Sequence, residues 1–231
     1  MSILLNLFFP PKCGFCGKIE NVVSERFICD HCLKEVQSLK LKTKIGDEVY
    51  SIFEYKALIR NMILNYKFRD KSYLYKTFTS CILFDENVCT FINSYDIITP
   101  VPLFYSRLWE RGYNQTALIC KELSKDTGIA YLATLNKVKN IKPQPTKDLA
   151  QRLKDVKGVY QLKNNVDIKE KSVLIFDDIL TTGATTGECK KALLIGGSKR
   201  VGILTLARGI DNREIKGEYN EQNYWWNNGL C

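Results

Sequence analysis

Two adjacent carboxylates and a run of hydroxyl side chains occur together in Asp177-Asp178-Ile179-Leu180-Thr181-Thr182-Gly183-Ala184-Thr185. The apolar residues before this run predict a strand over Ser172 to Phe176, and those after it have helical period, so the run should lead from a strand into a helix. Amides at a helix start attract phosphate, and Thr181, Thr182 and Thr185 add hydroxyl donors. Gly183 permits close approach of a ligand. Because no lysine follows this glycine, a Walker-type ATPase loop is disfavoured.

The two carboxylates need a separate explanation, because they would repel a bare phosphate. Asp177 and Asp178 are suited to accept hydrogen bonds from two vicinal ribose hydroxyls, directly or through Mg²⁺. A ribose 5-phosphate would satisfy both halves of the run. The simpler interpretation is a capped turn of an ordinary α/β protein, but capping requires only one Thr or Asp.

Four cysteines near the start form two Cys-x2-Cys pairs, Cys13 with Cys16 and Cys29 with Cys32, separated by twelve residues. This spacing predicts one tetrahedral Zn²⁺ site, and four thiolates leave no open position for catalysis, so the metal should be structural. A glycine follows each cysteine of the first pair, which suits a tight turn. The alternative is four reduced cysteines without metal.

These motifs resemble known families. The run at 177–185 resembles the signature of type I phosphoribosyltransferases, in which paired acids bind the ribose hydroxyls and the Thr-Gly loop binds the 5-phosphate. The whole chain resembles the ComF family, whose members join an N-terminal zinc ribbon to a phosphoribosyltransferase-like domain. Phe9-Pro10-Pro11, the turn at 99–103 and the stretch at 107–115 follow one another in family order.

The resemblance implies a zinc ribbon over residues 1–40 and a phosphoribosyltransferase-like domain over 41–231. It assigns Asp177 and Asp178 to the sugar and residues 181–185, including Ala184, to the 5-phosphate of phosphoribosyl diphosphate. The turn at 99–103 would contact the diphosphate, whose charge Arg107 and Arg111 could neutralise with bidentate contacts. Solvated surface arginines are an equally good interpretation of these two residues.

A segment with two prolines and basic residues, 142–152, resembles the flexible segment of the family, which could close over a diphosphate. An ordinary connecting loop explains it equally well. Asp155 and Tyr160 stand where many relatives carry Asn and Phe, so we assign them no role.

Two functions remain open from the sequence. In one, the protein binds phosphoribosyl diphosphate with Mg²⁺ and supports DNA uptake, with single-stranded DNA and a DNA-uptake helicase as partners implied by the resemblance. In the other, it is a phosphoribosyltransferase that moves phosphoribose to an unknown nitrogen nucleophile. No residue is an evident base for such an acceptor.

Composition is compatible with both. The 231 residues carry 34 basic and 25 acidic side chains, a net charge of +9, which predicts attraction to phosphates or nucleic acid. Lysine runs at 34–44 and 137–142 are candidate DNA contacts, although lysines on a solvated face are commoner. The apolar start is too short to span a bilayer and lacks a basic leader, so we expect a cytoplasmic protein without membrane insertion.

The elements that must position these groups follow an α/β pattern. Apolar runs alternate with segments of helical period, which predicts a mostly parallel sheet flanked by helices. Ligands then bind at the carboxyl ends of the strands. Expected strands are 49–55, 95–99, 131–135, 172–176 and 200–206, and apolar stripes indicate helices at 58–68, 116–123 and 186–194. The aromatic tail at 219–231 indicates no single role.

Overall fold

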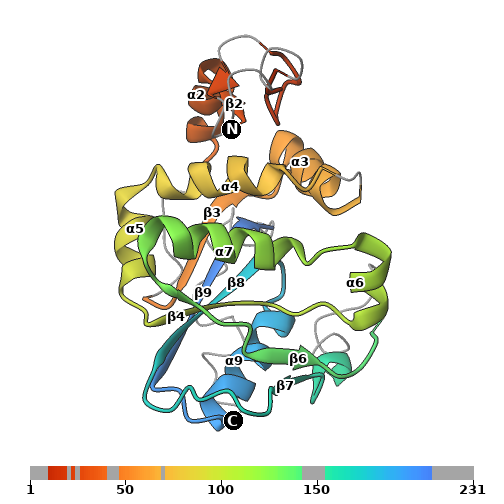
Figure 1. Cartoon of the computed structure of the whole chain (residues 1–231), viewed down its shortest axis with the longest axis vertical. Coiled ribbons are helices and arrows are strands. Elements are labelled where there is room, and N and C mark those ends of the chain that lie inside the picture. The colour runs from red at the N-terminus through yellow and green to blue at the C-terminus, as the bar shows by residue number, and fades with distance from the viewer. Residues whose placement is uncertain are drawn as a thin grey trace, which may run out of the picture.

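A computed structural model of the chain describes residues 10–19, 22–23, 27–40, 47–68, 71–141 and 154–209. Its centre is a parallel sheet of five strands in the order β3-β9-β8-β4-β5 (Figure 1). Buried apolar residues fill β9 and most of β8, as expected of strands covered on both faces. The strands are β3 (Val49–Glu54), β4 (Ile97–Pro100), β5 (Ala130–Tyr131), β8 (Ser172–Leu180) and β9 (Arg200–Arg208).

Helices cover both faces of this sheet. One face packs against α3 (Ala57–Phe68), α4 (Leu74–Leu83), α5 (Glu86–Asn93) and α7 (Gln115–Thr127), and the other against α9 (Ala184–Ile195). Alternate residues of β8 supply the two cores, Leu174 and Phe176 to the first and Val173 and Ile175 to the second. The predicted fold class, a mostly parallel sheet flanked by helices, is confirmed. Within the described ranges, no helix has the length and apolarity needed to cross a bilayer.

The strand expected at 131–135 is wrong in its extent. Two short strands take its place: β5, which ends at Tyr131, and β6 (Leu135–Lys137). The amide of Thr134 donates to Oγ1 of Thr99 at 3.1 Å instead of to a neighbouring strand, and this diverts the chain out of the main sheet. β6 then pairs antiparallel with β7 (Tyr160–Leu162), which packs on α9.

The N-terminal ribbon consists of β1 (Val22–Val23), β2 (Ile28–Cys29) and α2 (Asp30–Ser38). Figure 1 shows it beside α4, and Cys13, Cys29 and Val36 belong to the same buried cluster as residues of α4. The fit is close: a Cβ atom on Gly14 would lie 2.4 Å from Cδ2 of Leu74. A domain boundary near residue 40 remains a prediction.

A glycine near the start of β9, Gly202, allows a second close fit. Tyr95 is buried beneath the Arg200 guanidinium, which lies 4.3 Å from the centre of its ring. A Cβ atom on Gly202 would lie 2.1 Å from the hydroxyl oxygen of Tyr95. Any side chain at position 202 must therefore displace this tyrosine.

Candidate functional site

The two candidate acids lie on a strand and not on the loop predicted after Phe176. β8 continues to Leu180 because β9 pairs with it as far as Arg208. Adjacent strand residues point to opposite faces of a sheet, so Asp177 and Asp178 have different neighbours. Both carboxyl groups therefore belong to a strand segment that pairs with β9.

Asp178 is buried, and one of its two carboxylate oxygens has two partners. Its Oδ2 accepts from Nζ of Lys67 at 2.8 Å and from Nε2 of Gln115 at 3.0 Å. Lys67 lies in the last turn of α3, and Gln115 is the first residue of α7. The hydroxyl of Tyr66 donates to the carbonyl oxygen of Gln115 at 2.7 Å, which fixes the two helices together.

Asp177 is half-buried on the face toward α9. Burial raises the pKa of its carboxyl group, and the negative charge of Asp178 raises it further, while Lys67 and Lys137 oppose the shift. Lys137 comes from β6, with Nζ 5.6 Å from the centre of the Tyr160 ring. Burial lowers the pKa of Lys137, and the charge of Arg107 adds to this effect.

The hydroxyl-rich loop lies where the sequence predicts it, between β8 and the N-terminus of α9. Gly183 has a φ of 75°, a left-handed conformation that suits glycine, and α9 begins at Ala184. Oγ1 of Thr182 accepts from the amide of Ala184 at 3.4 Å. Thr181 is exposed and Thr185 is half-buried. Along the chain, the first backbone amides of α9 therefore follow the two carboxylates by only a few residues.

The two predicted arginines lie on α6 (Tyr105–Arg111), which follows the turn at 99–103. The Arg111 guanidinium stacks 4.8 Å from the centre of the Phe68 ring. Burial lowers the pKa of Arg111, whereas the nearby charge of Asp178 raises it and that of Arg107 lowers it. Arg111 is thus close enough to Asp178 for their charges to interact, whereas the charge of Arg107 acts on Arg111 and Lys137.

The segment predicted as a turn at 99–103 begins with the last two residues of β4, and it is fixed to the same site. The amide of Val101 donates to the carbonyl oxygen of Phe176 at 3.0 Å. The Asn114 side chain caps α7 and its Nδ2 donates to the carbonyl oxygen of Val101 at 3.1 Å. Three groups missing from the sequence prediction of this site are Lys67, Gln115 and the amine of Lys137.

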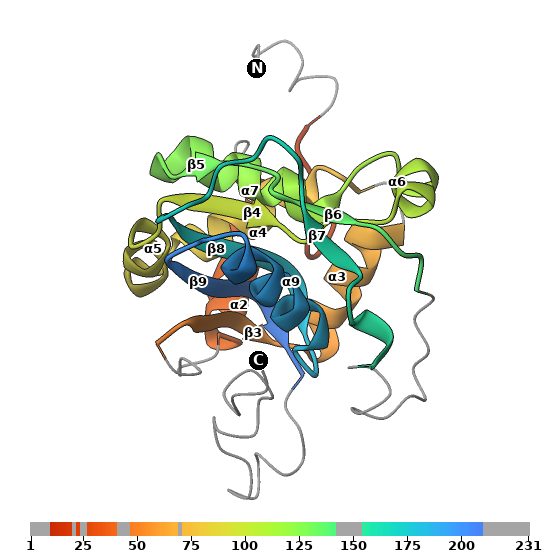
Figure 2. The same ribbon diagram turned by 90° about the horizontal axis from the view of Figure 1, so that it is seen from below.

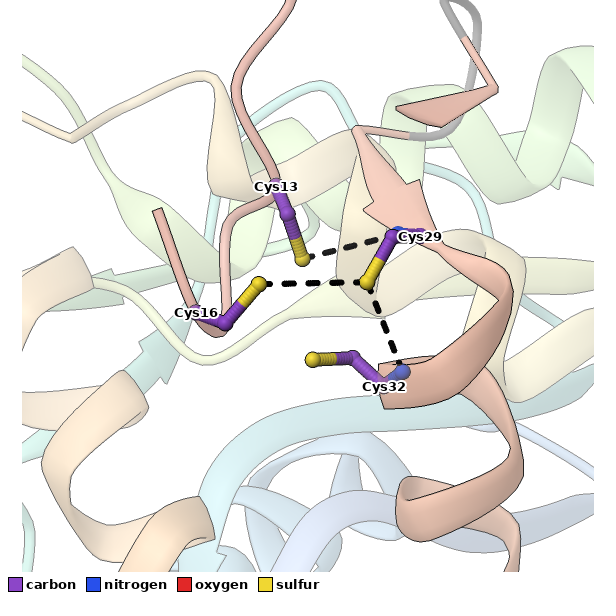
Figure 3. A group of neighbouring side chains, drawn as sticks. All are labelled: Cys13, Cys16, Cys29 and Cys32. Carbon is purple, nitrogen blue, oxygen red and sulfur yellow. Dashed lines mark hydrogen bonds between the residues drawn. The ribbon is translucent and has the colours of Figure 1, made fainter. Parts of the chain in front are cut away.

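The four predicted metal ligands converge (Figure 3). Their sulfur atoms all lie within 4.8 Å of one another, and those of Cys16 and Cys29 are 3.8 Å apart. Four sulfurs in a tetrahedron about 2.3 Å from zinc would be separated by roughly this distance. The amide of Cys29 also donates to Sγ of Cys13 at 3.5 Å, as expected near a thiolate. The cluster fits a structural zinc ion held by Cys13, Cys16, Cys29 and Cys32.

Some predicted features lie outside the described residues. These are the proline-containing segment at 142–152, residues 41–44 and 142 of the two lysine runs, and the aromatic tail at 219–231. Their suggested roles remain predictions.

Comparisons with known proteins found a family model and several solved structures. A family model described as a double zinc ribbon domain matches residues 4–43. Among solved structures, a purine phosphoribosyltransferase from Pyrococcus horikoshii is 18% identical with a TM-score of 0.38, covering 59% of this chain and 83% of that chain. An adenine phosphoribosyltransferase covers 61% of this chain and 81% of its own, with 12% identity and a TM-score of 0.34.

Sequence relatives cover most of the chain. Competence protein F of Haemophilus influenzae is 30% identical over 207 residues, 86% of this chain and 85% of the relative. Competence protein ComFC of Streptococcus pneumoniae is 30% identical and covers 85% and 87%, and the DNA utilization protein YhgH of Escherichia coli is 23% identical over 204 residues. The chain therefore belongs to the ComF family.

Proposed function

We propose that this protein binds phosphoribosyl diphosphate with Mg²⁺ at the carboxyl end of β8 and supports the uptake of DNA in the cytoplasm. The observation that carries the proposal is that one buried and one half-buried acid, a helix N-terminus with threonine hydroxyls, and three cationic side chains meet at one end of the sheet. An acidic pair beside a phosphate cradle suits a sugar phosphate better than a phosphate alone.

Each part of the ligand has matching groups. The amides of residues 183–185 and the hydroxyls of Thr181, Thr182 and Thr185 would bind the 5-phosphate. Asp177 and Asp178 would accept from the ribose hydroxyls. Arg107 and Arg111 would lie near the diphosphate, and Lys137, close enough to Arg107 for their charges to interact, adds a third positive charge.

Mg²⁺ is compatible with this site. Carboxylate oxygens are ligands that Mg²⁺ prefers, and it commonly binds through one or two carboxylates together with substrate phosphates. Asp177 is the better candidate, because Asp178 already accepts from Lys67 and Gln115. The ion would supply positive charge that neutralises the diphosphate.

The role in DNA uptake rests on family membership and on charge. The names of the relatives refer to competence and to DNA utilization. A net charge of +9 favours binding of single-stranded DNA, and a DNA-uptake helicase is the partner we expect.

Calorimetric titration of the zinc-replete protein with phosphoribosyl diphosphate and Mg²⁺ tests the central claim. The native protein should bind, and the double variant Thr182→Ala, Asp178→Asn should not. Thr90→Ala is the matched control, because Thr90 is an exposed threonine on α5, distant in sequence from the proposed site. Its hydroxyl donates to the carbonyl oxygen of Glu86 in the same helix. Thermal melting of each variant checks folding, and absence of binding by the folded native protein would contradict the proposal.

The alternative is an active phosphoribosyltransferase, in which a nitrogen nucleophile displaces diphosphate from ribose C1. The cluster of Arg107, Arg111 and Lys137 favours it, because these cations could stabilise the departing diphosphate. Incubation with phosphoribosyl diphosphate, Mg²⁺ and a panel of nucleobases, followed by measurement of released diphosphate, separates the two. Diphosphate release that requires an added nucleobase supports catalysis. Binding of phosphoribosyl diphosphate without diphosphate release supports a binding protein.

A further inference from the structure

A cavity lies on the edge of the sheet formed by β4 and β5, and one of its lining residues, Lys137, also interacts with Asp177. Its volume is about 650 Å³, within the range of small-molecule sites. The turn after β4, the helices α6 and α7, and the strand β6 form its walls, and Figure 2 shows these elements as neighbours. The candidate acids and the threonine loop do not line it.

Aromatic rings form two walls of this cavity. The rings of Phe104 and Tyr105 are 4.4 Å apart at their centres, and Tyr105 is 71% exposed although it lines a cavity. Tyr131 lines another part, with Nζ of Lys121 5.6 Å from the centre of its ring. Flat, rigid side chains in such an arrangement suit a planar ring that stacks on them.

The charge of the lining is one-sided. Among the described residues, the cavity is lined by Lys137 and Lys163 and by no carboxylate. Asn136, which is exposed on β6, adds an amide that offers both a donor and an acceptor. A ligand that fits this lining has a planar ring with hydrogen-bonding edges and carries negative charge.

We propose that this cavity binds one nucleotide unit, with its base against the rings and its phosphate near the lysines. The chemistry does not depend on the sugar-phosphate site, whereas the expected source, single-stranded DNA, rests on the proposed role in DNA uptake. The two sites share Lys137 and the turn at 99–103, so each ligand lies next to the other.

Fluorescence anisotropy with a labelled oligothymidylate tests the cavity, alongside calorimetry with thymidine 5′-monophosphate as the free-nucleotide probe. Tyr105→Ala should weaken oligonucleotide binding roughly tenfold, since one base stacks on one ring. Lys163→Gln should weaken it less and make binding less sensitive to salt, because one phosphate contact is lost.

Two matched controls change exposed residues that do not line the cavity. Trp109→Ala removes an aromatic side chain that is 89% exposed on the same helix but does not line the cavity, and Lys169→Gln removes an exposed lysine elsewhere. Neither control should change affinity. Binding of phosphoribosyl diphosphate by every variant, and oligonucleotide binding by Asp178→Asn, report on the two sites separately.

Every outcome of these binding measurements either supports or overturns the proposal. Loss of oligonucleotide affinity in the cavity variants but not in the controls supports the proposal. Comparison of oligonucleotide binding with monophosphate binding shows whether the ligand of the cavity is nucleic acid or a free nucleotide. Equal loss in cavity and control variants overturns it, because binding would then be a property of the general surface. Binding of neither probe overturns it as well, as does a dimer that Tyr105→Ala dissociates, since the rings would then serve a second copy of the chain.

Discussion

Asp177→Asn removes a carboxyl group that the folded protein holds at a raised pKa. Burial, helped by the charge of Asp178, raises that pKa to about 7, while the unfolded chain has an Asp pKa of about 3.9. Between these values the folded state binds more protons than the unfolded state, so the stability of the native protein should fall as the pH rises through this window. Asparagine has nearly the same shape and does not titrate, so the variant should lack this fall.

The size of the effect follows from the two pKa values. Each tenfold change in proton affinity corresponds to about 1.4 kcal/mol, so full ionisation of Asp177 costs the folded state about 4 kcal/mol at most. Water penetration and local relaxation reduce this limit, and about 1–4 kcal/mol at alkaline pH is a fair range. The variant should be more stable than the native protein by this amount.

Urea denaturation followed by circular dichroism measures the difference at about pH 5.5 and about pH 8. The stability advantage of Asp177→Asn over the native protein should grow by about 1–2 kcal/mol between these two pH values, because the carboxyl group of the folded native protein ionises near pH 7. More acidic conditions are avoided because thiolate protonation releases zinc. Asp126→Asn, an exposed carboxyl on α7, controls for general loss of negative charge. An advantage that does not change with pH, or a variant less stable at both values, would refute the reasoning.

Three further predictions concern stability. Gly202→Ala should cost about 1–3 kcal/mol in urea denaturation because of its collision with Tyr95, whereas Gly209→Ala, which meets no atom of the described residues within 4 Å, should not. Cys32→Ser should lower the zinc content, measured by atomic absorption, and the melting temperature together; unchanged zinc content would contradict the assignment. Lys67→Met should cost up to about 3–5 kcal/mol in the same denaturation assay, because it leaves a buried carboxylate without its cation; a fully stable variant would show that the ion pair contributes little.

The features that could be predicted depend on local sequence. Each Cys-x2-Cys pair and the threonine loop at 181–185 place their groups within a few residues, so their location followed from the pattern alone. The same holds for the helix at 58–68, which the apolar stripe predicts almost to its ends.

The features that could not be predicted depend on distant contacts. Lys67 ends an ordinary amphipathic helix, and only packing of α3 against β8 brings its amine to Asp178. β8 extends to Leu180 because β9 supports it, and the strand expected at 131–135 is interrupted by a hydrogen bond to Thr99. In each case the deciding partner lies far away in the sequence.

The order of strands in the sheet has a consequence for synthesis of the chain. β3 is the first strand of this sheet to leave the ribosome, yet its partner β9 is the last, and β4 must wait for β8. The edges of the early strands therefore stay unpaired through most of translation and are open to aggregation. A chain that stops before residue 200 would leave β3 without its neighbour and the acid pair without its support, so premature termination should yield an insoluble product and not a partly active one.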